Sequence, residues 1–172
     1  MIKSGIYLNL RIAVLFICLL IVSCEEELDD SVSGAFKLDP EFQTISMITE
    51  ASISLDVQNL SQPIFAMTMQ VNYNSSILLY TGFDDGGFFG SQNVVLVHAE
   101  QDSRLYIAVS IQQGNSEVDG SGSIGTFTFD GLDAGTSEID ISLTDLHFFD
   151  SGGNEISVGD FEIVPAMITV TS

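Results

Sequence analysis

Few side chains in this sequence combine the types and spacing that catalysis needs. His98 and His147 are the only histidines, and each lies within a strand-like run, outside any cluster with metal-ligand spacing. Glu100 and Asp102 are a carboxylate pair of the kind that glycoside hydrolases use. They flank a predicted hairpin turn, however, and acidic residues are common turn formers. The sequence therefore predicts structural histidines, a solvated turn and a protein that is not an enzyme.

Acidic loops supply the only cofactor chemistry, which is calcium binding. Asp84–Gly87 and Asp150–Glu155 each gather oxygen ligands on a glycine-containing loop. Asp119–Ser123 superficially resembles an EF-hand loop, but it lacks the second and third ligand positions and the closing glutamate. We predict no metal-ligand set and no cofactor, with calcium as the one ion that these loops would admit. The default interpretation of each loop is a solvated turn.

The N-terminal segment has the features of a secretory signal. Lys3 and Arg11 precede an unbroken apolar run, Ile12–Val22, and the small residue Ser23 stands directly before Cys24. The run is about half of the roughly 20 residues that a membrane-spanning helix needs. We predict a signal peptide over residues 1–23. An ordinary secretory signal cut at a nearby small residue, with Cys24 there by chance, is the alternative.

Residues 21–24, Ile-Val-Ser-Cys, resemble a bacterial lipobox. The resemblance implies that a diacylglyceryl group is added to Cys24, that cleavage makes Cys24 the first residue, and that its amine is acylated. Several acyl chains together give stable membrane anchoring. We therefore expect a lipid anchor at Cys24.

An acidic segment follows the cysteine. The run Glu25–Asp30 cannot fold on itself, so we expect residues 24–34 to form a solvated tether. The run is also similar to the acidic patch that directs surface lipoproteins of Bacteroidetes-type bacteria to the outer face of the outer membrane. This similarity implies a lipid-anchored, surface-exposed protein of the cell outer membrane, with placement in the inner leaflet left open.

The composition is strongly acidic. The chain has 24 acidic and 4 basic residues, a formal net charge of −20. Loss of residues 1–23 would leave Lys37 and Arg104 as the only basic residues and bring the charge near −22. Such a field repels phosphates and anionic lipids, which excludes nucleic acid as a partner.

Residues 35–172 have an all-β pattern. Short runs rich in Ile, Val, Phe, Thr and Tyr alternate with turn residues, and helical periodicity is nearly absent. We predict one domain, a two-sheet antiparallel β-sandwich of the jelly-roll type, with Gly120–Ser123 and Asp150–Asn154 as loops. The expected strands are Phe42–Ile48, Ile53–Val57, Ile64–Tyr73, Leu78–Gly82, Val94–Ala99, Arg104–Ile111, Ile124–Phe129, Ser137–Leu143, Leu146–Phe149 and Phe161–Val170.

The clearest alternation lies in Ile64–Tyr73. One side of this strand carries large apolar residues and should face the core, whereas the other side carries smaller or polar residues. The predicted core side consists of Phe65, Met67, Met69, Val71 and Tyr73, and the outward side includes Ala66, Thr68 and Gln70.

Three stretches resemble the cohesin module, the β-sandwich of cellulosome scaffolds that holds dockerin-tagged enzymes. Val71–Leu78 resembles the strand that ends in the family's "YDP..VL" turn, Gly122–Phe129 resembles its "G.L.TLTF" strand, and Thr136–Val158 resembles its closing "L.D..G..I.V" segment. In order, the resemblance covers about residues 51–170. It implies a cohesin-like fold and a non-catalytic module that holds a dockerin-type protein partner in polysaccharide degradation.

The resemblance also implies a partner face. In cohesins this face includes the strand that corresponds to Ile64–Tyr73, where an outward Asp or Asn often contacts the dockerin. Thr68 stands at that position here. We expect Ala66, Thr68 and Gln70 to belong to a flat, uncharged patch that a partner covers, because the centre of an interface is depleted in charge. An ordinary solvent face is the alternative.

A carbohydrate-binding or adhesion module is the competing hypothesis. The sequence has no Trp and four Tyr, which argues against a flat aromatic platform for crystalline polysaccharide. Phe83, Phe88 and Phe89, near a glycine-rich loop, are the best candidates for exposed rings that bind a glycan. The alternative is that this loop folds back onto the core.

Overall fold

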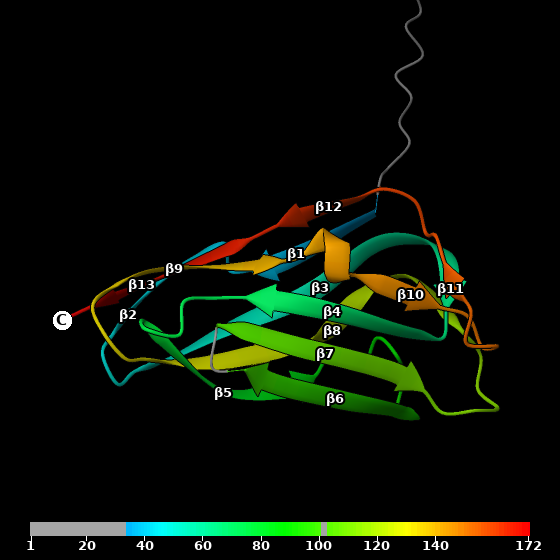
Figure 1. The fold of residues 1–172 in the computed structure, drawn as a ribbon, viewed down its shortest axis with the longest axis horizontal. Helices are drawn as coiled ribbons and strands as arrows, with labels where there is room; N and C mark the ends of the chain where they lie inside the picture. The colour runs from blue at the N-terminus through cyan, green and yellow to red at the C-terminus, as the bar shows by residue number, and fades with distance from the viewer. Residues whose placement is uncertain (1–33, 101–102) are drawn as a thin grey trace, which may run out of the picture. The chain divides into compact units, whose positions relative to one another are not determined.

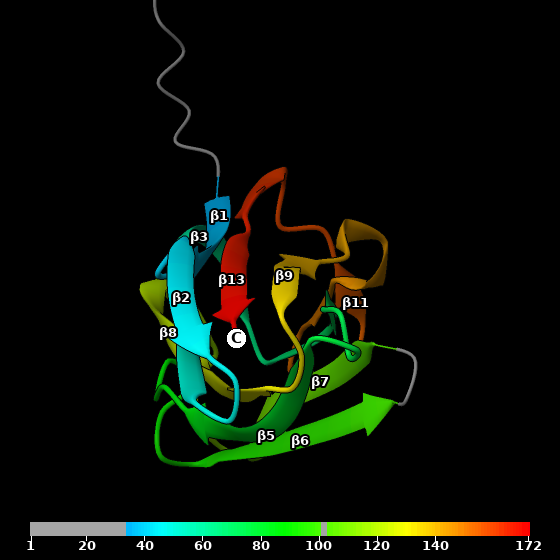
Figure 2. The same ribbon diagram turned by 90° about the vertical axis from the view of Figure 1, so that its left-hand side faces the viewer.

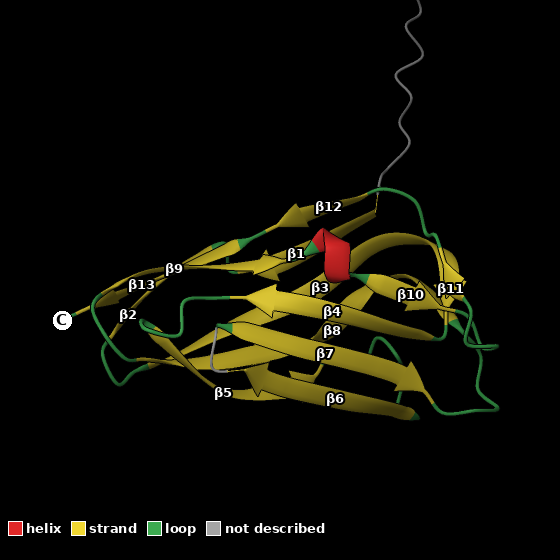
Figure 3. Cartoon of the chain, viewed as in Figure 1, coloured by secondary structure: helices red, strands yellow, loops and turns green. Residues whose placement is uncertain are grey.

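The computed structural model describes residues 34–100 and 103–172. These residues form strands joined by short connections, together with one turn of 3-10 helix, η1 (Leu143–Asp145) (Figure 3). The predicted signal peptide, Cys24 and nearly all of the tether lie outside the described residues. Within the two described ranges, the structure contains no helix whose length and apolarity would let it span a membrane.

Two sheets make up the domain (Figure 1). The first sheet has the order β12 (Phe161–Val164), β1 (Gly34–Asp39), β3 (Glu50–Ile64), β8 (Val118–Gly131) and β5 (Leu78–Asp85). The second follows the path β11 (Glu155–Ile156), β10 (His147–Phe149), β4 (Ala66–Asn72), β9 (Gly135–Ile141), β13 (Ala166–Thr171) and β2 (Phe42–Ser46). On the other side of β4, β7 (Arg104–Ile111) pairs with it, and β6 (Asn93–Glu100) pairs with β7.

Figure 2 views the two sheets along the longest axis of the domain. Apolar side chains fill the space between the sheets. Phe127 and Phe129 of β8 are fully buried, and the ring of Phe129 lies 5.3 Å from that of Tyr73. Near the other end, the ring of Phe36 of β1 stacks at 6.2 Å on Phe148 of β10 and so joins the two sheets. Burial of each side chain of this size stabilises the folded state by about 1.5–3 kcal/mol.

The predicted all-β sandwich is confirmed, with one correction to strand direction. β1 pairs with β12, and β13 pairs with β2, in parallel. These pairings arise because the N-terminal strands β1 and β2 and the C-terminal strands β12 and β13 lie side by side, one pair in each sheet. The remaining pairings are antiparallel, as expected.

Several strand limits differ from the sequence prediction. β1 was not expected, although Phe36 and Leu38 alternate along it and are both fully buried. The predicted loop Gly120–Ser123 lies within β8, where shifts in register against β3 accommodate the glycines. Pro165 divides the predicted strand Phe161–Val170 into β12 and β13, because proline has no N–H for the ladder and the chain changes sheets there.

The segment after β9 also needed correction. Ile139 and Ile141 are buried, as the alternation predicts. Leu143, which continues the same pattern, instead lies in η1 with 56% of its surface exposed. The strand ends because the chain turns at Ser142, whose hydroxyl donates to Asp145 Oδ2 at 2.6 Å and holds the turn.

Candidate partner-binding face

The outward side of β10, β4, β7 and β6 forms the candidate face, called the outer face below. These four strands lie side by side toward the viewer in Figure 1. On β4, Met67, Met69 and Val71 are buried, whereas Ala66, Thr68 and Gln70 are half-buried and point outward. The predicted facing of this strand is therefore confirmed. The strand itself is shorter than predicted, because Ile64 ends β3 and Phe65 forms a bend between the two sheets.

Strand register places the outward residues in transverse rows. Leu96 of β6, Ala108 of β7, Thr68 of β4 and His147 of β10 form one row. The neighbouring rows are Val94, Ser110, Ala66 and Phe149 on one side, and His98, Tyr106 and Gln70 on the other. The middle of this grid carries apolar, hydroxyl and amide groups and no Asp, Glu, Lys or Arg. In a chain with a net charge of −20, such a patch has the composition of an interface centre.

Charged groups lie at the margin of the outer face. The Arg104 guanidinium lies 5.7 Å from the centre of the Tyr106 ring, a cation–π distance. His147 Nδ1 lies 2.6 Å from Glu155 Oε1, and both side chains are exposed. Gln70 Nε2 donates to Asn72 Oδ1 at 2.7 Å, so this amide has a partner within its own strand. The rim is therefore polar around an uncharged centre, the usual anatomy of a binding surface.

A groove of about 550 Å³ runs over this face. Residues of three neighbouring strands line it, among them Thr68 and Met69 of β4, Ile107 and Ala108 of β7, and Leu96 of β6. His98, Tyr106, Asp145 and His147 also line it. The groove suits an apolar anchor residue held between polar neighbours.

The histidines were expected to be structural, and the structure shows both at the groove. They were missed as site residues because they are 49 positions apart and belong to strands that do not pair with each other. The hairpin between β6 and β7 was the available signal, since its register places His98 opposite Tyr106. The side chain of Glu100 and the whole of Asp102 lie outside the described part of the chain.

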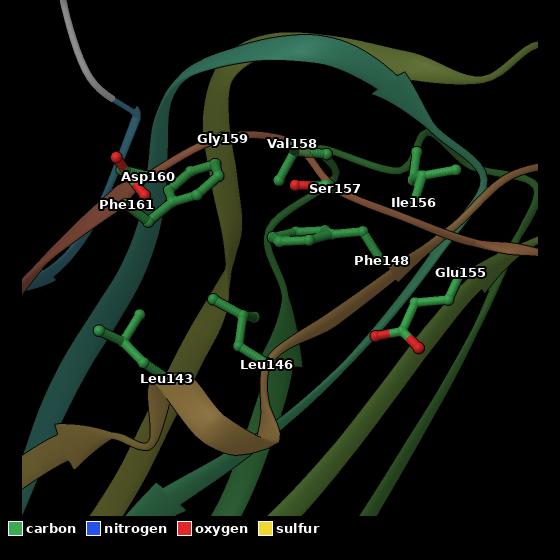
Figure 4. Close-up of a pocket in the computed structure, with 10 residues that line it drawn as sticks. All are labelled: Leu143, Leu146, Phe148, Glu155, Ile156, Ser157, Val158, Gly159, Asp160 and Phe161. Atoms are coloured by element: carbon green, nitrogen blue, oxygen red, sulfur yellow. The ribbon is translucent and has the colours of Figure 1, made fainter.

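A second hollow, of about 590 Å³, lies between η1 and the segment that leads into β12 (Figure 4). Leu143 and Leu146 line one side and Phe161 the other, with Phe148 between them. Phe148 is 5% exposed, and its ring stacks on Phe161 at 5.5 Å, so its faces are occupied by protein. The Phe148 ring is therefore not a free platform for a sugar ring.

Phe83, Phe88 and Phe89 do not form an open aromatic patch: Phe89 is buried, whereas Phe83 and Phe88 are half-buried and pack against the core, as the alternative of a folded-back loop predicts. Phe89 is 2% exposed, and Phe88 meets its ring edge-on at 5.3 Å. Phe83 packs on Phe127 at 5.0 Å. The loop folds back onto β8, where Gly125 and Gly122 leave room for Phe83 and Phe88; a Cβ on Gly122 would lie 2.7 Å from Phe88 Cδ2. Gly122, in a predicted loop, and Gly125, in a predicted strand, thus make space for these rings.

The acidic loops are held by their own hydrogen bonds. Asp150 Oδ1 accepts from the backbone N–H of Gly152 at 2.9 Å and of Asn154 at 2.8 Å. Bonds from the Asn154 side chain and backbone lower the pKa of Asp150. Asp85 likewise accepts from Gly87 N and Asn93 Nδ2. Among the described residues, no group of three or more His, Cys, Asp or Glu side chains is placed to hold a metal ion.

Comparison with known proteins identifies the architecture as that of a cohesin. The sequence model of the cohesin domain matches residues 49–163, and the chain belongs to this family, whose members are non-catalytic binding modules. Among curated proteins, none matches the chain.

Solved cohesin structures share the fold at low sequence identity. The third cohesin of ScaC from Acetivibrio cellulolyticus, solved with the ScaB dockerin, matches with a TM-score of 0.65 and 15% identity, over 81% of this chain and 99% of that one. The seventh type I cohesin of ScaB from Pseudobacteroides cellulosolvens matches with a TM-score of 0.65 and 14% identity, over 81% and 93%. A non-cellulosomal cohesin from Archaeoglobus fulgidus matches with a TM-score of 0.63 and 9% identity, over 81% and 92%.

Proposed function

We propose that this chain is a lipid-anchored cohesin of the outer-membrane surface, and that its outer face holds a dockerin-type protein module. Family membership supports a binding role. Two similar structures are complexes with dockerins, the ScaC cohesin above and Coh-OlpA–Doc918 from Clostridium thermocellum. The uncharged centre of the outer face is the observation that carries the proposal to particular residues, because Ala66, Thr68 and Gln70 lie within it.

Anchoring gives the binding module its place of action. The lipobox-like residues before Cys24 and the acidic run after it support attachment at the cell surface. A partner enzyme held there would act on polysaccharide beside the cell, so that its products are released close to the membrane. Similarity to a type II cohesin from the cellulosome of Acetivibrio cellulolyticus supports involvement in polysaccharide degradation, whereas the Archaeoglobus fulgidus cohesin is non-cellulosomal.

The experiment uses cells that display the full-length chain and fluorescent dockerin-type modules encoded in the same genome. Wild-type cells should bind at least one module. Thr68→Arg and Gln70→Glu each place an unmatched charge at the centre of the outer face and should weaken binding at least about tenfold, because an unmatched charge in an interface costs several kcal/mol. Thr44→Arg on β2, an exposed threonine outside the outer face, is the matched control and should bind as wild type.

Two results would contradict this proposal. If no dockerin-type module binds wild-type cells, the chain has another kind of partner, and the glycan hypothesis should be tested with soluble polysaccharides. If a module binds and the displayed, folded Thr68→Arg variant retains full affinity, the outer face is not the site.

A further inference from the structure

The edges of the two sheets differ in how well they are protected against pairing with another strand. Natural sheets protect their edges by short length, charge, proline or irregular register. β11 has two residues, and β12 has four and is followed by Pro165. β2 has five residues and follows Pro40 and Glu41. β5 ends in Asp84 and Asp85 and has a register shift against β8. Each of these four edges carries at least one such feature.

β6 has none of these features over most of its length. It has eight residues and pairs with β7 in unbroken register, and no other described strand pairs with it. Its residues 93–99 are Asn-Val-Val-Leu-Val-His-Ala, without a formal charge or a proline. Val94 and Leu96 are 47% and 65% exposed. A long, regular and apolar edge of this kind is a template for another strand.

The hydrogen-bond register shows which backbone groups face the open edge. Gln112 N donates to Gln92 O at 2.7 Å, which makes these two residues a hydrogen-bonded pair. Antiparallel ladders alternate hydrogen-bonded and non-hydrogen-bonded pairs, so Val94, Leu96 and His98 bond to β7. The N–H and C=O groups of the odd-numbered residues therefore point away from β7, and these residues are Asn93, Val95, Val97 and Ala99.

We propose that β6 pairs antiparallel with β6 of a second copy of this chain, about a twofold axis at Leu96. In this register Val95 forms a hydrogen-bonded pair with Val97 of the copy, and Val97 does so with the copy's Val95. Leu96 then faces its own counterpart in a non-hydrogen-bonded pair, in which the Cα atoms lie about 4.5 Å apart. The two outer faces join into one continuous sheet.

The sequence around Leu96 is nearly symmetrical, which favours a second copy as the occupant. Val95 and Val97 flank Leu96, and Val94 meets His98 of the copy two places out. Every cross-strand contact near the axis is thus uncharged, although each chain carries a net charge of −20. Pairing of two copies through β5 would instead bring Asp84 and Asp85 of both chains together.

The interface is small, so the dimer should be weak and reversible. One strand pair buries less than the about 800 Å² per partner of a standard interface. Long-range repulsion between two acidic molecules opposes association and is screened by salt, so the dimer should strengthen as the ionic strength rises. The pairing is argued from β6 alone and does not depend on the proposed partner.

Disulfide trapping in cells that express the full-length chain tests the register. Leu96→Cys should give a disulfide-linked dimer on a non-reducing gel, because the predicted Cα separation lies in the range that disulfides accept. Val94→Cys is the matched control: it lies on the same side of β6, but the offset of four residues at about 3.4 Å each places it about 14 Å from its counterpart. The wild-type chain, expressed in the same way, gives the background of cross-linking through Cys18 or Cys24.

Co-expression then tests orientation. Val94→Cys expressed together with His98→Cys should form a mixed dimer, since these positions face each other in the proposed register. A Leu96→Lys and a Leu96→Glu chain, carrying different tags, should each lose self-association and should regain it when mixed. Leu132→Lys, at a 48% exposed site outside β6, should self-associate as wild type.

The proposal is overturned if Leu96→Cys, at wild-type expression, cross-links no more than Val94→Cys does. It is also overturned if Leu96→Cys is trapped on a different protein in place of its own copy, because β6 would then receive a partner's strand.

Discussion

Thr68 on β4 and Leu96 on β6 lie in one row of the outer face, separated only by Ala108 of β7. Thr68 is central to the proposed partner contact, and Leu96 to the proposed contact between copies. Both residues also line the groove, so mutation is needed to separate the two contacts. Thr68→Arg should weaken dockerin binding at least about tenfold while leaving the cross-linking of Leu96→Cys unchanged, as measured on the same displayed cells. Loss of both by Thr68→Arg would mean that one surface serves both contacts, or that the variant is misfolded.

Ile141 of β9 should be essential for the core. It is 2% exposed and lies opposite Val71 of β4. Ile141→Asp buries an unpaired charge, which should cost at least about 4 kcal/mol and lower the melting temperature by more than about 10 °C. Ile48→Asp, at a site with 92% exposure, should stay within about 0.5 kcal/mol of wild type. A melting temperature for Ile141→Asp within a degree or two of wild type would refute the facing of this strand.

Gly125 should not tolerate a methyl group. A Cβ there would overlap the Phe83 ring and lie 2.6 Å from the carbonyl oxygen of Asp84. Gly125→Ala should therefore destabilise the domain by about 1–3 kcal/mol through overpacking. Gly82→Ala on the adjoining strand is the control, because nothing lies within 4 Å of its Cβ position. Chemical denaturation of both variants measures the difference, and equal stability would contradict the packing of Phe83 on β8.

Asp150 should contribute stability in a pH-dependent way. Its carboxylate accepts bonds from Asn154 and from the backbone of the turn, which lower its pKa in the folded state. A lowered pKa of Asp150 stabilises the folded state at pH values above 3.8, the pKa in the unfolded chain. This stabilisation is lost as the pH falls through the pKa of the folded state. Thermal melts should show Asp150→Ala less stable than wild type at pH 7 and closer to it at pH 2. A gap that stays constant would show that the ionised carboxylate is not what stabilises the turn.

Cys24 should carry the lipid. Cells fed a clickable fatty acid should label the wild-type chain, and Cys24→Ala should lose the label because the acceptor sulfur is gone. Cys18→Ala, within the predicted signal, is the matched control and should be labelled normally. Equal labelling of Cys24→Ala would contradict the prediction of a lipoprotein and favour an ordinary secretory signal.

Local alternation in the sequence predicted much of the fold. Met67, Met69 and Val71 alternate with smaller or polar residues along β4, so their burial could be read directly from the sequence. The same reasoning failed where long-range packing decides the structure. Gly122 reads as a turn residue and Gly125 as an ordinary strand residue, because nothing local shows that Phe88 and Phe83 fill the space above them.

The candidate site was only partly predictable for a related reason. Thr68 was predicted as a site residue from the resemblance to cohesins and from the alternation along its strand. Both signals lie within one short stretch of sequence. His98, Tyr106 and His147 join it through sheet order, which places β6, β7 and β10 beside β4. The residue pattern of a single segment does not reveal the order of strands in the sheet. The hairpin turn near Ser103 does predict that β6 pairs with β7.

The position of β1 bears on how the domain would carry a mechanical load. The chain enters the fold at Gly34, and β1 is bonded on one side to β12 and on the other to β3. Tension applied along β1 from its N-terminal end acts in shear, so the bonds of both ladders resist it together and do not open one after another. A sandwich tethered through this strand would withstand drag on a bound partner better than one tethered through a strand that can be peeled from an edge.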